Sequence, residues 1–265
     1  MDKLFVIKIG GQVIDDENLL QDLLRQFASL QGKKILIHGG GKLATRLAEK
    51  LQVPQQMVDG RRITDEETLR IVTMVYAGYI NKNIVARLQS MECNAIGLTG
   101  ADASLIMAHK RIHATMDYGF VGDIDTVNPL VIQQLLDQSL SLVIAPITHD
   151  GKGQLLNTNA DTIAQEIARA LCGRYETKLI YTFEKAGVLL NVEDENSVIS
   201  RLNLQYYKEL KEPKEGPVRI FAGMIPKLDN AFAAIDSGVK EVIIGKAGQL
   251  SELIAGTAGT TILNE

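Results

Sequence analysis

Two segments near the N-terminus place glycines directly after apolar, strand-like runs. The run "LFVIKI" (4–9) holds one cation, Lys8, and is followed by Gly10 and Gly11, while "KILIH" (34–38) is followed by three glycines at 39–41. A strand that ends in glycine and enters a helix leaves backbone N–H groups free for an anion, and glycine lets the ligand approach closely. Lys8 would add a positive charge beside that anion. The pattern indicates a phosphate or carboxylate site, although tight turns and a lysine that reaches solvent would also produce it.

Two later clusters carry further polar side chains to the starts of helices. In "GQLLNTNADTIA" (153–164), Asn157, Asn159 and Asp161 precede an apolar helical pattern, and in "FAGMIPKLDNAFAAI" (221–235) Gly223 precedes a helix whose first turn holds Lys227. A cation in a first turn opposes the helix dipole, so Lys227 is a candidate for binding an anion. The alternatives are an exposed lysine and, for Asp161, a simple helix N-cap.

The glycines do not form the common phosphate-binding loop. Leu43 follows Gly41-Lys42 where that loop needs Ser or Thr, and Leu36 stands where its first glycine should be. The dinucleotide pattern G-x-G-x-x-A does match at 39–44, with Asp59 at a suitable distance. A nicotinamide site would need an apolar strand that ends at Asp59, but "VPQQMVD" (53–59) does not form a strand of useful length. The nicotinamide site stays as an alternative interpretation of the glycines at 39–41.

The elements that must position these residues alternate between strand and helix patterns. Strands are predicted at 4–9, 34–38, 95–100, 141–147, 178–183 and 241–245, helices at about 19–30, 42–51, 64–91, 161–172 and 226–237, and a β-hairpin at 105–127. Thr64, with Glu67 three residues on, predicts a capping box at the start of the third helix. This alternation predicts an α/β fold with a mostly parallel sheet covered by helices on both faces, and a lobe boundary near Gly173.

The composition excludes several classes of protein. Of the 265 residues, 46% are hydrophobic, but no window approaches the ~18 uninterrupted apolar residues of a membrane span. The net charge of −4 and the lack of a basic cluster argue against a nucleic-acid partner. Cys93 and Cys172, both in apolar contexts, fit buried, reduced thiols. Since the first strand also leaves no room for a signal peptide, we expect a cytoplasmic protein without a membrane partner.

Taken together, these segments resemble the amino acid kinase family, and within it the enzymes that phosphorylate an N-acylated glutamate. The matching motifs occur in the family's order over essentially the whole chain: "KIGG" (8–11), "HGGG" (38–41), "DGRRITDEE" (59–67), "GFVGDIDTVNP" (119–129), "GQLLNTNAD" (153–161) and "GMIPK" (223–227). The resemblance implies a carbamate-kinase-like three-layer αβα sandwich on one continuous sheet. Residues 1–172 would form the amino-acid-substrate lobe and residues 173–265 the ATP-binding lobe.

The resemblance also implies a reaction and roles for single residues. The γ-phosphoryl group of ATP would pass to the side-chain carboxylate of N-acetyl-L-glutamate, or of another N-acylglutamate, in arginine biosynthesis. Lys8, Lys227 and Asp161 would be the catalytic residues. The acceptor would contact Gly40, Gly41, Arg62 and Asn157, and the nucleotide would contact Gly10, Gly11, Thr182, Glu184, Gly187, Val188 and Met224.

The chemistry of the implied reaction agrees with these residue types. Catalysis of phosphoryl transfer is mostly positioning and charge neutralisation. A carboxylate acceptor is already ionised, so no general base is needed. Mg²⁺ would be held chiefly by the nucleotide phosphates, so no set of protein metal ligands is expected. His109 and His113 stand four residues apart, but on a hairpin rather than a helix face, which disfavours a metal pair.

The chain departs from the family's pattern at three places. In "TFEKAGVLL" (182–190), Glu184 and Leu190 replace two aspartates of the nucleotide loop. The N-terminal helix of arginine-inhibited hexameric relatives is absent, so we expect a homodimer without feedback by arginine. Arg61 stands where the family commonly has an apolar residue. A second cation beside the α-carboxylate site would suit an acyl group with its own carboxylate, such as succinyl, unless Arg61 simply points to solvent.

Other functions stay open at this point. The same fold would serve an aspartate, glutamate, carbamate or uridylate kinase, which the "DGRRIT" and "GQLLNTNAD" matches disfavour. A nicotinamide-dependent oxidoreductase would respond to NAD(P)H rather than to Mg·ATP. A non-catalytic effector-binding protein of this fold would have no need of Lys8, Lys227 and Asp161.

Overall fold

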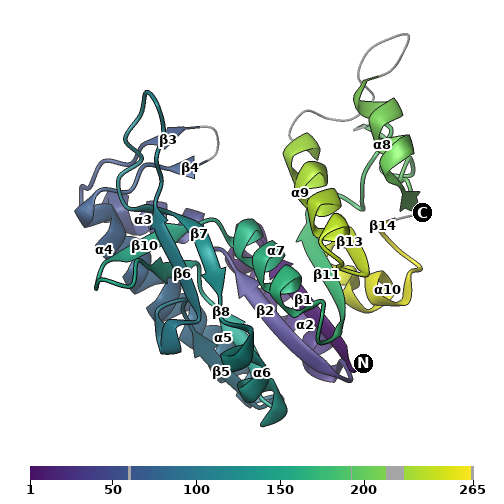
Figure 1. Cartoon of the computed structure of the whole chain (residues 1–265), viewed down its shortest axis with the longest axis horizontal. Coiled ribbons are helices and arrows are strands. Elements are labelled where there is room, and N and C mark those ends of the chain that lie inside the picture. Colours follow the sequence, from purple (N-terminus) through teal and green to yellow (C-terminus); the bar gives the residue numbers. More distant parts are fainter. Residues whose placement is uncertain (59–60, 192, 213–223, 264–265) are drawn as a thin grey trace.

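A computed structural model describes residues 1–58, 61–191, 193–212 and 224–263, and one large sheet forms its centre (Figure 1). The strand order is β12-β14-β13-β11-β1-β2-β8-β5. The six strands from β13 to β5 are all parallel, β14 is antiparallel to β13, and β12 is parallel to β14. The strands are β1 (Lys3–Ile9), β2 (Lys33–His38), β5 (Ala95–Leu98), β8 (Ser141–Ile144), β11 (Glu176–Phe183), β12 (Arg201–Leu202), β13 (Glu241–Lys246) and β14 (Thr260–Ile262).

Helices cover both faces of this sheet. On one face lie α6 (Pro129–Asp137), α7 (Ala160–Leu171), α8 (Leu204–Lys211) and α9 (Ile225–Asp236). On the other lie α1 (Gly11–Asp15), α2 (Glu17–Ser29), α3 (Gly41–Lys50), α4 (Glu66–Thr73), the π-helix η1 (Met74–Ile80), α5 (Asn81–Gln89) and α10 (Leu250–Ala255). The short 3₁₀ turns η2 (Asp102–Ser104) and η4 (Ala247–Gln249) complete the series.

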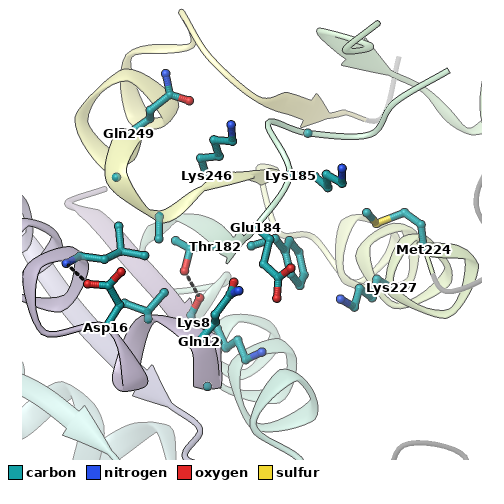
Figure 2. Close-up of a pocket in the computed structure, with 18 of the residues that line it drawn as sticks. Lys8, Gln12, Asp16, Thr182, Glu184, Lys185, Met224, Lys227, Lys246 and Gln249 are labelled. Carbon is teal, nitrogen blue, oxygen red and sulfur yellow. Dashed lines mark hydrogen bonds between the residues drawn. The ribbon is translucent and has the colours of Figure 1, made fainter. Parts of the chain in front are cut away.

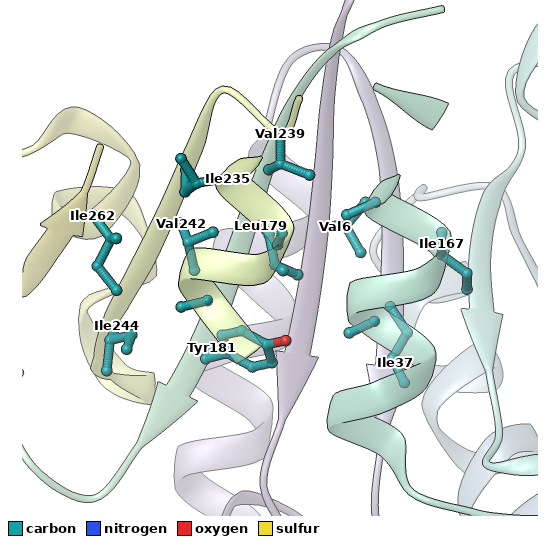
Figure 3. Close-up of a cluster of buried hydrophobic side chains, with 14 of the residues drawn as sticks. Val6, Ile37, Ile167, Leu179, Tyr181, Ile235, Val239, Val242, Ile244 and Ile262 are labelled. Carbon is teal, nitrogen blue, oxygen red and sulfur yellow. The ribbon is translucent and has the colours of Figure 1, made fainter. Parts of the chain in front are cut away.

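Strand β1 shows why this arrangement is stable. Its side chains alternate between the two cores: Leu4 and Val6 pack with the α7 and α9 side, whereas Phe5, Ile7 and Ile9 pack with the α2 side. A central parallel strand is buried on both faces, so its sequence is apolar almost throughout. Figure 3 shows Val6 and Ile37 of the sheet against Ile167 of α7, within the first of these cores. The sequence-based prediction of a three-layer α/β sandwich on a mostly parallel sheet is therefore confirmed.

A smaller closed sheet stands beside the large one. It contains β6 (Ile106–Lys110), β7 (Val121–Val127), β9 (Ile147–His149) and β10 (Leu155–Thr158). The predicted hairpin is confirmed, since β6 and β7 pair antiparallel with an irregularity between Met107 and Ala108. A two-residue pair, β3 (Met57–Val58) and β4 (Arg61–Arg62), lies before α4.

Several local predictions were wrong. The N-cap of α4 is Asp65, whose side chain accepts from the Thr68 N–H, and not Thr64. The segment predicted as one helix from 64 to 91 contains seven residues of π-helix in its middle. The strand predicted over 141–147 divides at Ala145-Pro146, and β9 then joins the small sheet. Proline has no N–H to donate to the ladder, which accounts for the break.

The remaining sequence-based expectations concern membranes and cysteines. None of the helices in the described residues is long and apolar enough to cross a membrane. Both cysteines are free, and Cys93 is buried as predicted, but Cys172 is only partly buried.

Candidate active site

The two glycine turns lie side by side at the carboxyl ends of β1 and β2. Ile9 is in register with His38, and the N–H of Gly39 donates to the carbonyl of Ile9 at 3.3 Å. A Cβ added to Gly39 would lie 3.7 Å from the backbone nitrogen of Gly11. Ligands of parallel sheets gather at this edge. Since α1 begins at Gly11 and α3 at Gly41, both turns present the N–H ends of helices there.

Gly40, the middle glycine of the second turn, has a backbone conformation that favours glycine. Its φ is 148°, in a region that L side chains rarely adopt, and an added Cβ would lie 2.2 Å from Cδ1 of Ile80. The turn is thus pressed against the π-helix. A side chain at this position would be strained at this φ, and either Ile80 or the turn would have to shift.

A buried histidine, His38, contacts the backbone of the glycine turn that follows β2. His38 is fully buried, and its Nδ1 lies 2.8 Å from the carbonyl oxygen of Gly39. Asn81 contacts the other ring nitrogen at 3.3 Å and donates to the Val143 carbonyl at 3.0 Å. Burial lowers the pKa of His38 to about 4, so the ring is neutral at pH 7 and donates to Gly39 through Nδ1–H. His38 opens the motif "HGGG" (38–41), but this supporting role was not predicted from the sequence.

Lys8 and Asp161 form the charged centre of the site. Their Nζ and Oδ1 atoms are 2.7 Å apart, and the Lys8 side chain is 11% exposed. The alternative interpretation of Asp161 as an N-cap was wrong. Asn159 caps α7 by accepting from the N–H groups of Asp161 and Thr162, which leaves the Asp161 carboxylate free to hold Lys8.

Lys227 reaches the same region from the first turn of α9. Its Nζ lies 3.8 Å from the centroid of the Phe183 ring, and the Nζ of Lys8 lies 5.8 Å from the same ring. Burial lowers the pKa of Lys227, and Lys8 lowers it further, while Asp161 and Glu184 oppose the shift. Figure 2 shows Lys8 and Lys227 on either side of Glu184.

A cavity of about 910 Å³ opens beside these lysines. It is lined by the turn after β1, the end of β11, the start of α9 and the end of β13, with both apolar and charged residues in its lining (Figure 2). Nine residues named from the sequence line it: Lys8, Gly10, Gly11, Thr182, Glu184, Gly187, Val188, Met224 and Lys227. We call it the large cavity.

A second cavity of about 380 Å³ lies beyond the turn after β2. Gly40, Gly41, Arg62 and Asn157, the residues named from the sequence for the acceptor, all line it. Arg62 is buried and donates to the carbonyl of Gly41 at 3.0 Å, to Oγ1 of Thr45 at 2.8 Å and to Oε1 of Gln55. These bonds fix the guanidinium beside Gly41, the last glycine of the turn. We call this space the small cavity.

Asn157 is held in the small cavity through Thr64. Its Nδ2 donates to Oγ1 of Thr64 at 3.0 Å, and that hydroxyl donates to the carbonyl of Arg62 at 2.9 Å. Thr64 is completely buried, and its carbonyl accepts from the Phe120 N–H at 2.6 Å. Thr64 therefore links β10, β4 and the approach to β7.

Some predicted residues lie outside the described part of the structure, and others were missed. Asp59, Gly223 and the side chain of Arg61 are not among the described residues. Lys246 and Gln249 line the large cavity, and Tyr76 and Arg111 line the small one. Lys246 could have been found, since "EVIIGK" (241–246) is another strand that ends in glycine and a cation. Nothing in the sequence marks the other three.

The described residues carry no group of three or more His, Cys, Asp or Glu side chains placed to hold a metal ion. His109 instead pairs with Asp125 through Nδ1 at 2.7 Å. The strand that a nicotinamide site would need before Asp59 is limited to the two residues of β3. Asp59 therefore does not follow an apolar strand of useful length.

Comparison with known proteins identifies a family. Residues 3–246 match the model of the amino acid kinase family. The acetylglutamate kinase of Cytophaga hutchinsonii is 56% identical over 255 residues, which cover 96% of this chain and 95% of that protein. The acetylglutamate kinase of Parabacteroides distasonis is 50% identical over 252 residues, covering 95% and 97%.

Solved structures agree on the fold. The N-acetylglutamate synthase of Neisseria gonorrhoeae matches with a TM-score of 0.80 at 21% identity, and the chain covers 60% of that longer protein. A carbamate kinase of Giardia matches with a TM-score of 0.71 at 13% identity over 99% of its length. At these identities the likeness concerns the fold alone.

Proposed function

The chain belongs to the amino acid kinase family, and we propose that it transfers the γ-phosphoryl group of ATP to the side-chain carboxylate of N-acetyl-L-glutamate, as in arginine biosynthesis. It is an enzyme, a phosphotransferase with a carboxyl group as acceptor. The observation that carries the proposal is the contact between the two glycine turns. One turn lines the large cavity and the other lines the small cavity, so ligands in the two cavities meet where the turns touch.

The large cavity is proposed as the nucleotide site. Lys8 and Lys227 supply two positive charges, and the N–H groups after β1 face the same space. Asp161 holds Lys8 in place through an ion pair in which Nζ and Oδ1 are 2.7 Å apart. Mg²⁺ would arrive on the phosphates of the nucleotide, and Glu184 is one of the carboxylates that line the cavity.

The small cavity is proposed as the acceptor site. Arg62 suits the α-carboxylate because its planar fork can bond both oxygens. Asn157 would bond the substituent on the α-nitrogen, and the N–H groups of Gly40 and Gly41 would receive the side-chain carboxylate. The acceptor would then extend from Arg62 toward the charged centre at Lys8.

The proposed reaction needs no proton transfer. An oxygen of the ionised acceptor carboxylate forms a bond to the γ-phosphorus, the bond from that phosphorus to the β–γ bridging oxygen breaks, and ADP leaves with the electron pair. Two anions must approach each other, so the chain's contribution is charge neutralisation and alignment. Removal of one such donor typically costs ~3–4 kcal/mol of transition-state stabilisation.

We also propose a lobe division and a homodimer. The residues that line the small cavity all fall within 39–162, while the large cavity combines 8–19 with 182–249. This supports a substrate lobe at 1–172 and an ATP lobe at 173–265 that share the turn after β1.

The surface proposed for the homodimer lies on the π-helix. Met74 and Tyr79 of the π-helix are 55% and 66% exposed beside apolar residues of α3, and exposed apolar patches often mark contacts with another subunit. Light scattering of the purified protein should give the mass of a dimer, and Tyr79→Glu should reduce it to that of a monomer. A monomeric wild-type protein would contradict the dimer.

The function is tested by following ADP release from Mg·ATP with N-acetyl-L-glutamate, N-succinyl-L-glutamate and free L-glutamate in parallel. The proposal predicts turnover of the acylated compounds and little of free glutamate. Silence with all three, in protein that Mg·ADP still stabilises against heat, would overturn it. A cytoplasmic location, also proposed, would be checked by fractionating cells that express the protein.

A further inference from the structure

The small cavity contains an arginine that the proposed reaction does not use. Arg111 follows β6 and lines the cavity together with Arg62 and Asp123. Its side chain is only 15% exposed. Its Nη1 is buried and has no hydrogen-bond partner among the described residues. A buried guanidinium nitrogen without an acceptor is costly, so a ligand that brings an acceptor to it would gain free energy.

The rest of the Arg111 guanidinium is rigidly held. Its Nε donates to both carboxylate oxygens of Asp123 at 3.1 Å, and its Nη2 donates to the same carboxylate. The guanidinium carbon lies 5.6 Å from the centroid of the Tyr118 ring. The carboxylate of Asp123 raises the pKa of Arg111, so the group is always charged. Asp123 thus holds the Nε and Nη2 side of the guanidinium, and Nη1 has no hydrogen-bond partner among the described residues.

The reacting parts of the acceptor have other partners in the proposed function. The α-carboxylate goes to Arg62, the phosphorylated carboxylate goes to the glycine turns, and the start of the acyl group goes to Asn157. An acetyl group ends in a methyl, which can accept no hydrogen bond. A longer acyl chain that ends in a carboxylate would bring an acceptor of matching charge, and the cavity of about 380 Å³ is within the size range of small-molecule sites.

Resting on the proposed function, we propose that Arg111 is a specificity-determining residue that binds the far end of the acyl group, and that the enzyme favours N-acyl-L-glutamates whose acyl chain ends in a carboxylate. N-succinyl-L-glutamate belongs to this class. This assigns to Arg111 the recognition that the sequence had suggested for Arg61, whose side chain lies outside the described residues.

The test compares two acyl groups of equal length. N-Succinyl-L-glutamate and N-butyryl-L-glutamate both carry four carbons in the acyl chain, and only the first ends in a carboxylate. Values of kcat/KM for both, and for the N-acetyl compound, are measured with the wild-type enzyme, Arg111→Met and Lys110→Met. Lys110 is the matched control, because it is the neighbouring cation, is half exposed, pairs with Asp117 and does not line the small cavity.

We expect the wild-type enzyme to prefer the succinyl over the butyryl compound by about 10-fold to 100-fold, the range of a hydrogen bond to a charged group. Arg111→Met should abolish that preference, and Lys110→Met should preserve it. Equal values for succinyl and butyryl in the wild type would overturn the proposal.

An equal loss for all three substrates in Arg111→Met would also overturn it, because Arg111 would then only hold the hairpin in place. Heat stabilisation by Mg·ADP, which would bind in the other cavity, shows that the variant is folded. The two proposals fail differently. Turnover of the acetyl compound without a succinyl preference contradicts only the role of Arg111, whereas no turnover of any acylated glutamate contradicts the kinase function itself.

Discussion

The two cavities use different cations, and they hold them differently. In the large cavity the cations that face the glycine turn are lysines, and Lys8 is held by one ion pair to Asp161. In the small cavity the cations are arginines, and Arg62 and Arg111 are each fixed by several hydrogen bonds. A lysine is a compact charge on a flexible stem, whereas an arginine presents a planar fork. The difference suits phosphates that shift during transfer on one side, and a carboxylate that must stay in place on the other.

The largest expected effect comes from removing the charge at the centre of the lysine side. Lys8→Met should lower kcat by about 10³-fold, the upper range for the loss of one transition-state donor. Lys33→Met is the matched control, since Lys33 stands at the other end of a neighbouring strand and pairs with Asp137 at 2.6 Å. It should stay within about threefold of wild type. Equal activity of Lys8→Met and Lys33→Met would remove Lys8 from the reaction.

The support beneath the glycine turn should appear as a pH dependence of stability. The pKa of His38 is about 4 in the folded protein, against 6.5 when the residue is exposed. The unfolded chain therefore binds more protons between these values, and stability falls as the pH drops from 6.5 toward 4, by up to about 3 kcal/mol. Urea unfolding at pH 7 and pH 4.5 measures the loss.

The variant His38→Gln should lose that component, so its stability should depend less on pH over the same range. His109→Gln is the control, because His109 is half exposed and belongs to β6 rather than to the support of the turn. A pH dependence that stays unchanged in His38→Gln would mean that another group titrates.

Replacing the guanidinium of Arg62 should have a smaller effect, confined to binding in the small cavity. Arg62→Lys keeps the positive charge but loses the planar pair of donors, so KM for N-acetyl-L-glutamate should rise about 10-fold to 100-fold. KM for ATP should change little, because Arg62 does not line the large cavity. A matching rise in both KM values would show that the two sites are not separate in this way.

The smallest effect concerns Lys227. Because its pKa is lowered by burial and by Lys8, its ammonium group loses the proton at a lower pH than an ordinary lysine. Activity should therefore decline on the alkaline side below pH 10.5, as the required charge is lost. Lys227→Arg, which stays charged, should move that decline to higher pH. A pH–rate profile with the same alkaline limb in both proteins would contradict this assignment.

The sequence predicted the lysine side more completely than the arginine side. Lys8 stands at a strand end and Lys227 at a helix start, where hydrophobic periodicity indicates their place. Arg111 and Tyr76 come from a hairpin end and a π-helix, so their approach to the small cavity depends on long-range packing. The cap of α4 shows a similar limit: Thr64 and Asp65 are both good caps, and the contacts of Thr64 with the small sheet decide between them.

The central claim is that a phosphoryl group crosses between the two cavities at the glycine turns. The most direct measurement incubates the enzyme with Mg·ATP labelled at the γ-phosphate, N-acetyl-L-glutamate and hydroxylamine, and detects the hydroxamate that forms when hydroxylamine captures an acyl phosphate. The claim predicts one hydroxamate for each ADP released, with almost none from Lys8→Met. Release of ADP with labelled inorganic phosphate but no hydroxamate would contradict it, because the phosphoryl group would then have passed to water.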